Sequence, residues 1–393
     1  MKFSVVMPYR QRLANVRMAF ASLAEQTLGH TAFEVIVGCL EYSPEFVALC
    51  QEYAGRLRIV TVVAGDDWSV SRARNLALRQ VTGDVVLFLD CDMVIPADFL
   101  SNLWERYYQH GQQVCVSGQM IGYDEAVDAD VAAPRSQPWE VHREALAGLA
   151  TADRAALDIR WSDKFASAVR RYPWAHVRGG IIALSTGVLL RHDLTFDEGF
   201  HGWGPEDQEW AYRVAASGTP IVLASDVYGL HLPHHRDQAE NGRTAWPNNR
   251  YYLAKWPHLG LELAMSFGGW LDADALHDDA ERDLADAVSG PGRTHGVARG
   301  LVGGVDTLVV GVELDRRTAA PVPEHRALFD AGAPTQVLSL AGFALPFDDG
   351  DVEQCRVLPA VSALPPRWRD VIVAEAGRVS RKPPAVDVLS PIG

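Results

Sequence analysis

The chain has 393 residues, of which 48% are hydrophobic and 22% charged, a composition typical of a globular protein of roughly two to three domains. Its formal net charge of −14 excludes a protein that holds nucleic acid through its overall field. No apolar stretch approaches the roughly 18 residues that a membrane crossing needs, and the strand-like residues after Lys2 leave no room for a signal peptide.

The five cysteines show no C-x-x-C spacing. Cys39 and Cys91 lie in apolar, strand-like runs, which indicates buried thiols in a reducing compartment. We therefore expect a cytoplasmic protein.

A first predicted strand, residues 3–7, ends at a polar segment. This segment reads Pro8, Tyr9, Arg10, Gln11 and Arg12. Arginines just beyond the carboxyl end of a strand are well placed to bind a nucleotide diphosphate or base. On these five residues alone, the start of a solvated helix is an equally good interpretation.

The next elements alternate between helices and strands. Helical spacing of apolar residues covers 16–26 and 46–53, and strand-like runs cover 34–40 and 57–63. Glu41 follows the second strand, where its carboxylate can accept hydrogen bonds from a ribose or base, or simply be solvated.

A helix capped by Ser69 or Ser71 is predicted next, and its first turn carries Arg72 and Arg74. Cations in this turn oppose the helix dipole, and a bound anion nearby would offset that cost. Ion pairs with the neighbouring aspartates are the alternative, and both arrangements can hold at once.

The segment Val85–Pro96 organises the rest of the chain. Its apolar residues 85–89 predict a strand buried on both faces, and Asp90 and Asp92 follow that strand. Carboxylates at the carboxyl end of such a strand lie where open α/β sheets bind ligands. On an extended backbone the two aspartates share a face and can ligate Mg²⁺ or Mn²⁺. A lone D-x-D is more often a cap, but the strand in front of it favours the metal.

Residues 1–96 thus alternate strand and helix, which predicts an α/β fold with a mostly parallel, doubly wound sheet. A helix over 99–110 and a strand over 113–122 extend this pattern. Residues 124–172 are rich in Ala, Asp, Glu and Arg, and we interpret them as helices and a mobile loop over the site.

A second polar cluster follows in the middle of the chain. Gly179 and Gly180 allow a ligand to approach the backbone closely. Trp203 stands between two glycines, which suits a wall that stacks on a sugar ring or a moving loop. Glu206 and Asp207 open the next helix, where acids are favourable through the helix dipole alone. We nevertheless prefer a functional role for Asp207, because a carboxylate there can take the proton of an acceptor hydroxyl.

A strand over 221–226 leads into a third cluster, in which His231, His234 and His235 lie within five positions. His231 and His234 are three apart and separated by a proline, so both can face one ion. A lone histidine is usually structural or solvated. Three of them, in a chain that already offers two aspartates, favour a metal site.

Six segments taken together resemble the nucleotide-sugar glycosyltransferases of the GT-A fold, family 2 type. That fold is Rossmann-like, a mostly parallel sheet with helices on both faces. The resemblance covers roughly the first 250 residues. The second half of this region also resembles the carboxyl-terminal part of the β-1,4-galactosyltransferases and of the polypeptide N-acetylgalactosaminyltransferases. The six segments occur in the family's order and are Pro8–Arg12, Ser71–Asn75, Phe88–Pro96, Arg178–Ser185, Gly202–Arg213 and His231–Arg236.

The resemblance implies a role for each matching residue on the donor side. Arg10, Arg12 and Arg72 would contact the nucleotide of the donor. Asp92 would bind the metal directly, whereas Asp90 would hold the ribose or the sugar. The remaining candidates for donor binding are Pro8, Tyr9, Glu41 and Gly180.

The resemblance also assigns the metal and acceptor sides. His234 matches the family's metal histidine, and His231 stands where galactosyltransferases place a methionine ligand. Trp203 would lie near the donor phosphate and the acceptor sugar. Asp207 would be the catalytic base, with Glu206 supporting the donor or the acceptor.

These roles predict an inverting transferase that uses Mn²⁺ or Mg²⁺. It would move a hexose or N-acetylhexosamine from a UDP-sugar to a hydroxyl of a peptide, natural product or oligosaccharide. The metal would neutralise the leaving phosphates, and one base would activate the acceptor from the opposite face of the sugar. The alternative is a non-catalytic module that keeps the fold and binds the nucleotide sugar or the metal.

We predict three parts, namely a GT-A catalytic domain over 1–265, an acidic helical connector over 266–295 and a small Rossmann-like α/β appendage over 296–393. The appendage faintly resembles the middle of a class I methyltransferase, through the strand Val305–Leu314 and an LPF-x-DG turn. The glycine-rich cofactor loop of those enzymes is missing. We therefore predict an appendage without activity of its own, which binds the acceptor or a partner or makes a homodimer contact.

Overall fold

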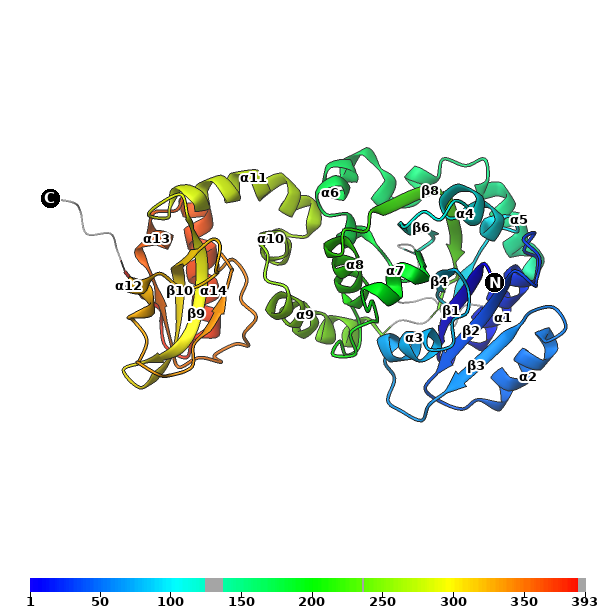
Figure 1. Cartoon of the computed structure of the whole chain (residues 1–393), viewed down its shortest axis with the longest axis horizontal. Coiled ribbons are helices and arrows are strands. Elements are labelled where there is room, and N and C mark those ends of the chain that lie inside the picture. Colours follow the sequence, from blue (N-terminus) through cyan, green and yellow to red (C-terminus); the bar gives the residue numbers. More distant parts are fainter. Residues whose placement is uncertain (124–136, 235–236, 388–393) are drawn as a thin grey trace. The chain divides into compact units, whose positions relative to one another are not determined.

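The computed structural model describes residues 1–123, 137–234 and 237–387, and the chain divides into two compact units, Met1–Ala245 and Trp246–Gly393 (Figure 1). Each unit has its own sheet. The predicted boundaries at residues 265 and 295 fall inside the second unit and stay predictions. Among the described residues, no helix combines the length and the apolar composition that a membrane crossing requires.

The first unit is built on an eight-stranded sheet in the order β3-β2-β1-β4-β7-β6-β8-β5. Its strands are β1 Phe3–Tyr9, β2 Phe33–Cys39, β3 Ile59–Val63, β4 Val85–Leu89, β5 Met93–Val94, β6 Cys115–Ile121, β7 Ile181–Ser185 and β8 Ile221–His231. The four strands at the β3 end are parallel, as the alternation of strands and helices predicts. β7 pairs antiparallel with β4 and β6, so the sheet as a whole is mixed.

Helices cover both faces of this sheet. They are α1 Leu13–Ala24, α2 Pro44–Tyr53, α3 Val70–Leu78, α4 Phe99–Tyr107, α5 Trp139–Leu149, α6 Ala166–Arg171, α7 Thr186–Arg191 and α8 Glu206–Ala216. Successive side chains of a strand point to opposite faces. Val5 and Met7 of β1 accordingly pack in one core with α1, α2 and α4, whereas Val6 packs in a second core with α3, α7 and α8. The predicted α/β class, with helices on both faces, is therefore confirmed.

Two local features decide where the site forms. α3 begins after Ser69, whose Oγ accepts a hydrogen bond from the N–H of Arg72 at 3.3 Å, as the sequence predicts. β8 continues past its predicted end to His231, because Met93 of the short strand β5 pairs with it. The prediction that His231 follows the strand is therefore wrong, and it is the last residue of β8.

Part of one prediction falls on residues that the structure leaves undescribed. Of the segment 124–172, which we interpret as helices and a loop, residues 124–136 lie outside the described residues. The remainder contains α5 and α6, so the helical part of the expectation is confirmed.

The second unit has a five-stranded sheet in the order β11-β9-β10-β12-β13. Its strands are β9 Arg293–Val302, β10 Val305–Asp315, β11 Gln336–Leu338, β12 Gln354–Val357 and β13 Ala385–Val386. Its helices are α10 Leu259–Phe267, α11 Trp270–Asp286, α12 Pro323–Arg326, α13 Pro359–Ser362 and α14 Pro366–Val379, and the division between the units falls within α9 Gln238–Lys255. β9 and β10 form an antiparallel hairpin, and β12 and β13 continue the sheet in parallel.

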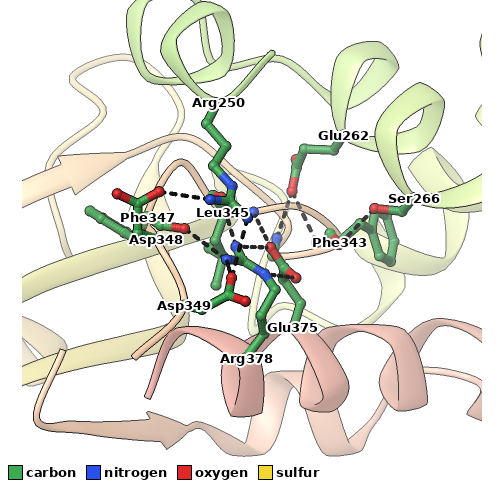
Figure 2. A network of polar contacts seen from close by, with 11 residues as sticks. Arg250, Glu262, Ser266, Phe343, Leu345, Phe347, Asp348, Asp349, Glu375 and Arg378 are labelled. Carbon is green, nitrogen blue, oxygen red and sulfur yellow. Dashed lines mark hydrogen bonds and ion pairs between the residues drawn. The ribbon is translucent and has the colours of Figure 1, made fainter. Parts of the chain in front are cut away.

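A polar network fixes the loop 341–349 of the second unit. Figure 2 shows Glu262 of α10 directed at this loop, where its carboxylate accepts hydrogen bonds from three successive backbone N–H groups, 341–343, at 2.8 to 3.0 Å. Arg250 of α9 and Arg378 of α14 both donate to Asp349, at 3.3 and 2.7 Å (Figure 2). Three helices therefore hold the loop through charged side chains.

Candidate active site

A cavity of about 840 Å³ lies in the first unit, beside the residues that follow β1 and β4. Carboxyl ends of parallel strands meet at one edge of a sheet, which is where α/β folds bind ligands. The cavity is lined by eleven of the predicted site residues, namely Pro8, Arg10, Arg12, Asp90, Asp92, Gly180, Trp203, Glu206, Asp207, His231 and His234. Side chains from distant parts of the sequence thus share one cavity.

Three predicted donor-binding residues do not line this cavity. Tyr9 is buried, and its ring stacks on Phe46 with 4.1 Å between the centroids. Glu41 accepts a hydrogen bond from Gln11 at 3.4 Å. Arg72 is exposed and pairs with Asp66 at 2.5 Å, which is the ion pair that the sequence left open. Their roles in donor binding stay predictions.

Strand pairing brings the candidate metal ligands together. Met93 pairs with His231 across β5 and β8, and the N–H of Leu232 donates to the carbonyl of Asp92 at 2.8 Å. Asp92 Oδ1 lies 3.8 Å from His231 Nε2, and Asp92 Oδ2 lies 3.2 Å from His234 Nε2. One ligand atom from each of the three side chains lies within 4.8 Å of the other two.

This donor set fits Mn²⁺ better than Mg²⁺, the other predicted cation, because Mg²⁺ prefers oxygen ligands. A carboxylate oxygen and two imidazole nitrogens, largely shielded from solvent, suit Mn²⁺ and related divalent ions. Arg12 Nη1 also donates to Asp92 Oδ2, so a guanidinium already faces the same carboxylate. This positive charge offsets part of the charge of Asp92 and attracts anionic groups, such as the oxygens of a diphosphate, to this part of the cavity.

Asp90, the first acid of the D-x-D, belongs to a second cluster of charges. Its Oδ1 lies 3.0 Å from Arg74 Nη2, and Glu206 Oε1 lies 3.4 Å from Arg74 Nη1. The pairing of β4 with β7 holds Asp90 in place, because its N–H donates to the carbonyl of Gly180 at 3.3 Å. The Arg74 side chain is only 2% exposed, so a full positive charge is buried between the two carboxylates.

Asp207, the candidate base, is held by backbone. Its Oδ2 accepts from the N–H of Gly179 and its Oδ1 from the N–H of Gln208, both at 2.8 Å. Burial raises the pKa of Asp207, and the Arg74 guanidinium partly opposes this shift. Burial and the neighbouring Asp207 also raise the pKa of Glu206. Two carboxyls with raised pKa values beside a cavity are a typical arrangement for proton transfer.

Trp203 and Gly180 are the two remaining predicted residues that line the cavity. Trp203 is half exposed, and its backbone N–H donates to Thr244 Oγ1 at 3.0 Å. Gly202 before it has φ of 78°, and a Cβ there would meet Thr244 Cγ2 at 2.5 Å, so only glycine fits this turn. The space beside Gly180 is taken by the side chain of Met120, which gives this glycine a packing role besides lining the cavity.

Several lining residues were not assigned to the site from the sequence. Arg74 was predicted only as a first-turn cation that binds an anion or pairs with neighbouring aspartates, and it pairs with Asp90 and Glu206 instead. Its position four residues before the buried Leu78 indicates that it lies on the buried face of α3. Trp68 lies under the Arg10 guanidinium, 5.7 Å from its ring centroid, and Arg178 lies 4.3 Å over the ring of Tyr123. These contacts join residues from different elements, and no spacing in the sequence indicates them.

The chain is similar in sequence to known glycosyltransferases. Residues 4–152 match the family model described as Glycosyl transferase family 2. The chain is 27% identical over 273 residues to the validoxylamine A glucosyltransferase of Streptomyces hygroscopicus subsp. jinggangensis (strain 5008), an alignment that covers 66% of this chain and 62% of the relative. It is 24% identical over 261 residues to the chondroitin synthase of Escherichia coli, covering 62% of this chain and 37% of the relative.

Among solved structures, the chain is similar to S. aureus TarS 1-349 in complex with UDP-GlcNAc. The TM-score is 0.46 at 18% identity, and the match covers 73% of this chain and 71% of that chain.

The chain spans less than two thirds of the length of the two relatives named above. They support the predicted enzyme class, glycosyltransferase. The comparisons give no support to the finer resemblance to β-1,4-galactosyltransferases and polypeptide N-acetylgalactosaminyltransferases, which stays a prediction. For residues 4–152, the predicted membership of glycosyltransferase family 2 is confirmed.

Proposed function

We propose that the protein is a metal-dependent, inverting glycosyltransferase that moves a hexose or N-acetylhexosamine from a UDP-sugar to an acceptor hydroxyl. One observation carries this proposal. A single cavity is lined by the guanidinium groups of Arg10 and Arg12, by the Asp92–His231–His234 cluster and by the carboxyl pair Glu206 and Asp207. The family match and the name of the glucosyltransferase relative support the same class.

The donor would bind at the carboxyl end of β1. Arg10 is exposed there and Arg12 is partly exposed, so both guanidinium groups are available to oxygens of a diphosphate. Asp90 would hold the ribose or the sugar. Tyr9, Glu41 and Arg72 lie away from the cavity, and a part for them in donor binding rests on the family resemblance alone.

The Asp92–His231–His234 cluster would hold Mn²⁺ or Mg²⁺. A divalent cation bound there would neutralise charge on the departing diphosphate without proton transfer. The protein's own contribution is to keep three ligand atoms within 4.8 Å of one another through the pairing of β5 with β8. Arg12 adds a further positive charge beside Asp92.

Asp207 would accept the proton of the acceptor hydroxyl. Its raised pKa brings its basicity closer to neutral pH, which improves proton transfer there. Glu206 would support the donor or the acceptor from the same helical turn. The half-exposed Trp203 offers an apolar ring face on which an acceptor sugar can stack. One base and one displacement invert the anomeric centre, which is the reason for proposing inversion.

The acceptor is proposed as a class only. The names of the two relatives refer to validoxylamine A and to chondroitin, which supports a natural product or an oligosaccharide beside a peptide. A cytoplasmic location and a homodimer contact through the appendage follow from the sequence and stay predictions.

The proposal is tested by incubating the purified protein with UDP-, GDP- and dTDP-sugars and Mn²⁺, and measuring free nucleoside diphosphate. We expect slow release from one UDP-sugar, which chelation abolishes and added Mn²⁺ restores. A folded protein that binds a UDP-sugar in the presence of Mn²⁺ but releases nothing would instead be the non-catalytic module. Absence of both binding and release with every donor would overturn the proposal altogether.

A further inference from the structure

Arg74 joins carboxylates that come from distant parts of the sequence. Its Nη2 lies 3.0 Å from Asp90, just past β4, and its Nη1 lies 3.4 Å from Glu206, the first residue of α8. Asp207, the proposed base, follows Glu206 directly and also lies in the field of this guanidinium. The donor-side and acceptor-side acids of the cavity thus share one cation.

The guanidinium is enclosed on its remaining sides. It lies 4.8 Å over the ring of Phe196. A Cβ added at Gly179 would fall well inside van der Waals contact with Nη2, so only glycine leaves room for the arginine. The N–H of the same Gly179 donates to Asp207 at 2.8 Å, and the segment that seats Arg74 therefore also orients the base.

The backbone that carries Arg74 is fixed as well. Asn75 Nδ2 donates to the carbonyl of Phe196 at 2.8 Å, and the N–H of Phe196 donates back to Asn75 Oδ1 at 2.8 Å. This pair of hydrogen bonds ties α3 to the residue whose ring lies under the guanidinium. The position of the charge is therefore set by the fold and not by a flexible side chain.

We propose that Arg74 is a positioning residue, whose one guanidinium sets Asp90 and the Glu206–Asp207 pair relative to each other for the transfer step. This inference rests on the proposed function. Arg74 acts through the carboxylates, because its two terminal amino groups already face them and its side chain is 2% exposed. A phosphate would have to displace one carboxylate to reach it, whereas Arg10 is exposed, and Arg12 is partly exposed although its Nη1 donates to Asp92.

The arrangement has an electrostatic consequence for the base. Asp207 is faced by Arg74 from α3, by Asp90 from the end of β4 and by Glu206 from its own helix. Arg74 is the positive charge among these groups and lowers the pKa of Asp207 against the effect of burial. Removing the charge therefore raises the pH at which the base becomes ionised.

The test compares Arg74→Met and Arg74→Lys with the wild type. Arg79→Met is the matched control, an exposed arginine at the end of the same helix. For Arg74→Met we expect kcat to fall about 10²-fold, while the Kd for UDP changes less than about threefold. The acid limb of the kcat profile should move up by about one pH unit. In Arg74→Lys the acid limb should return to its wild-type pH, but kcat should stay low. The reason is that an ammonium is a point charge that cannot hold two carboxylates in a fixed geometry.

Two results would overturn the proposal. A Kd for UDP that rises about tenfold with kcat unchanged would make Arg74 a donor contact instead. An acid limb that does not move in Arg74→Met would show that the arginine does not act on the base. Should Arg74→Met fail to fold, Arg74→Lys decides, because it keeps the charge and removes the fork that holds two carboxylates. We expect it to lower kcat with UDP affinity retained, and unchanged turnover would contradict the proposal.

A third measurement needs no turnover and separates this inference from the proposed function. Without Arg74, the pKa values of the buried Glu206 and Asp207 should be raised further above their unfolded-state values. A carboxyl with a raised folded-state pKa contributes less to folding stability as pH rises through that pKa. The Tm of Arg74→Met should therefore fall further below that of the wild type between about pH 5 and about pH 8. A Tm difference between Arg74→Met and wild type that stays constant over this range would overturn the proposed role of Arg74. This result would count even in a protein that turns over no donor.

Discussion

Buried carboxylates occur in both units, Glu206 with Asp207 in the first and Glu262 in the second. Burial raises the pKa of Glu206 and Asp207, and it raises the pKa of Glu262 to about 7. The surroundings differ. Glu206 and Asp207 line a cavity together with a candidate metal cluster. Glu262 is buried, and the backbone N–H groups of residues 341–343 donate hydrogen bonds to its two carboxyl oxygens (Figure 2).

The comparison shows that a raised pKa alone does not identify a catalytic acid or base. Glu262 satisfies backbone donors that would otherwise be buried without an acceptor, so its carboxyl oxygens stabilise a loop. Asp207 also accepts hydrogen bonds from two backbone N–H groups, but it lines a cavity large enough for a substrate. We therefore expect substitutions in the first unit to change turnover and substitutions at Glu262 to change stability.

The largest expected effect is on turnover, in Asp207→Asn. The amide keeps the size of the side chain but cannot accept the proton, so kcat should fall about 10³-fold. The Kd for UDP should stay within about threefold of the wild-type value, because Asp207 is assigned to the acceptor hydroxyl and not to the nucleotide. Steady-state kinetics and calorimetric titration of UDP measure the two quantities. Unaltered turnover in Asp207→Asn would contradict the assignment of Asp207 as the catalytic base.

The next effect is on stability, in Glu262→Ala. This change leaves three buried N–H groups without their acceptor, and we expect a local cost of about 3 kcal/mol. Hydrogen exchange of the 341–343 amides in the full chain should then accelerate about 10²-fold. Glu281→Ala, an exposed glutamate of α11, is the control and should leave this exchange unchanged. Unchanged exchange in Glu262→Ala as well would end the contrast between the two units.

A smaller effect is expected at the metal cluster. His234→Ala removes one imidazole ligand, and we expect the Mn²⁺ concentration for half-maximal turnover to rise about 10- to 100-fold. The Tm increase on adding Mn²⁺ should shrink in parallel, which gives a readout independent of turnover. His192→Ala, an exposed histidine that follows α7, should behave as the wild type. An unchanged Mn²⁺ requirement would place the metal elsewhere.

The smallest effects are those of pH, and they have opposite signs in the two units. Asp207 must be ionised to act, so turnover should fall as pH is lowered, with a midpoint above the ordinary aspartate value of 3.8. Glu262 has a folded-state pKa raised from 4.5 to about 7, so its contribution to stability is full below about pH 4.5 and falls as pH rises towards 7. Denaturation of wild type and Glu262→Gln at several pH values isolates this contribution, because glutamine does not titrate. A stability difference that does not change with pH would contradict it.

Much of the first unit could be predicted because its signals are local. Apolar runs of strand length alternate with helical spacing, and the parallel half of the sheet follows from that alternation. The direction of β7 could not be predicted, since an apolar run reads the same in both directions. The extension of β8 to His231 depends on pairing with the two-residue strand β5, which has no signal of its own.

The candidate site was predictable where chemistry-bearing residues follow strands or open a helix, as for Asp92, Asp207 and His234. Arg74 was missed as a central residue because its importance lies in two carboxylates from distant segments. Glu262 had no visible signal at all. Its partners are backbone N–H groups, which every residue but proline carries, so the sequence does not distinguish them.

The central claim is that the cavity of the first unit transfers a sugar by one displacement with Asp207 as the base. The most direct test is the anomeric configuration of the sugar released or transferred from the donor, followed by proton NMR in the presence of Mn²⁺. The account predicts a product of inverted configuration, formed by the wild type and lost in Asp207→Asn. A product of retained configuration would contradict the single-displacement mechanism, and a product formed equally well by Asp207→Asn would contradict the assigned base.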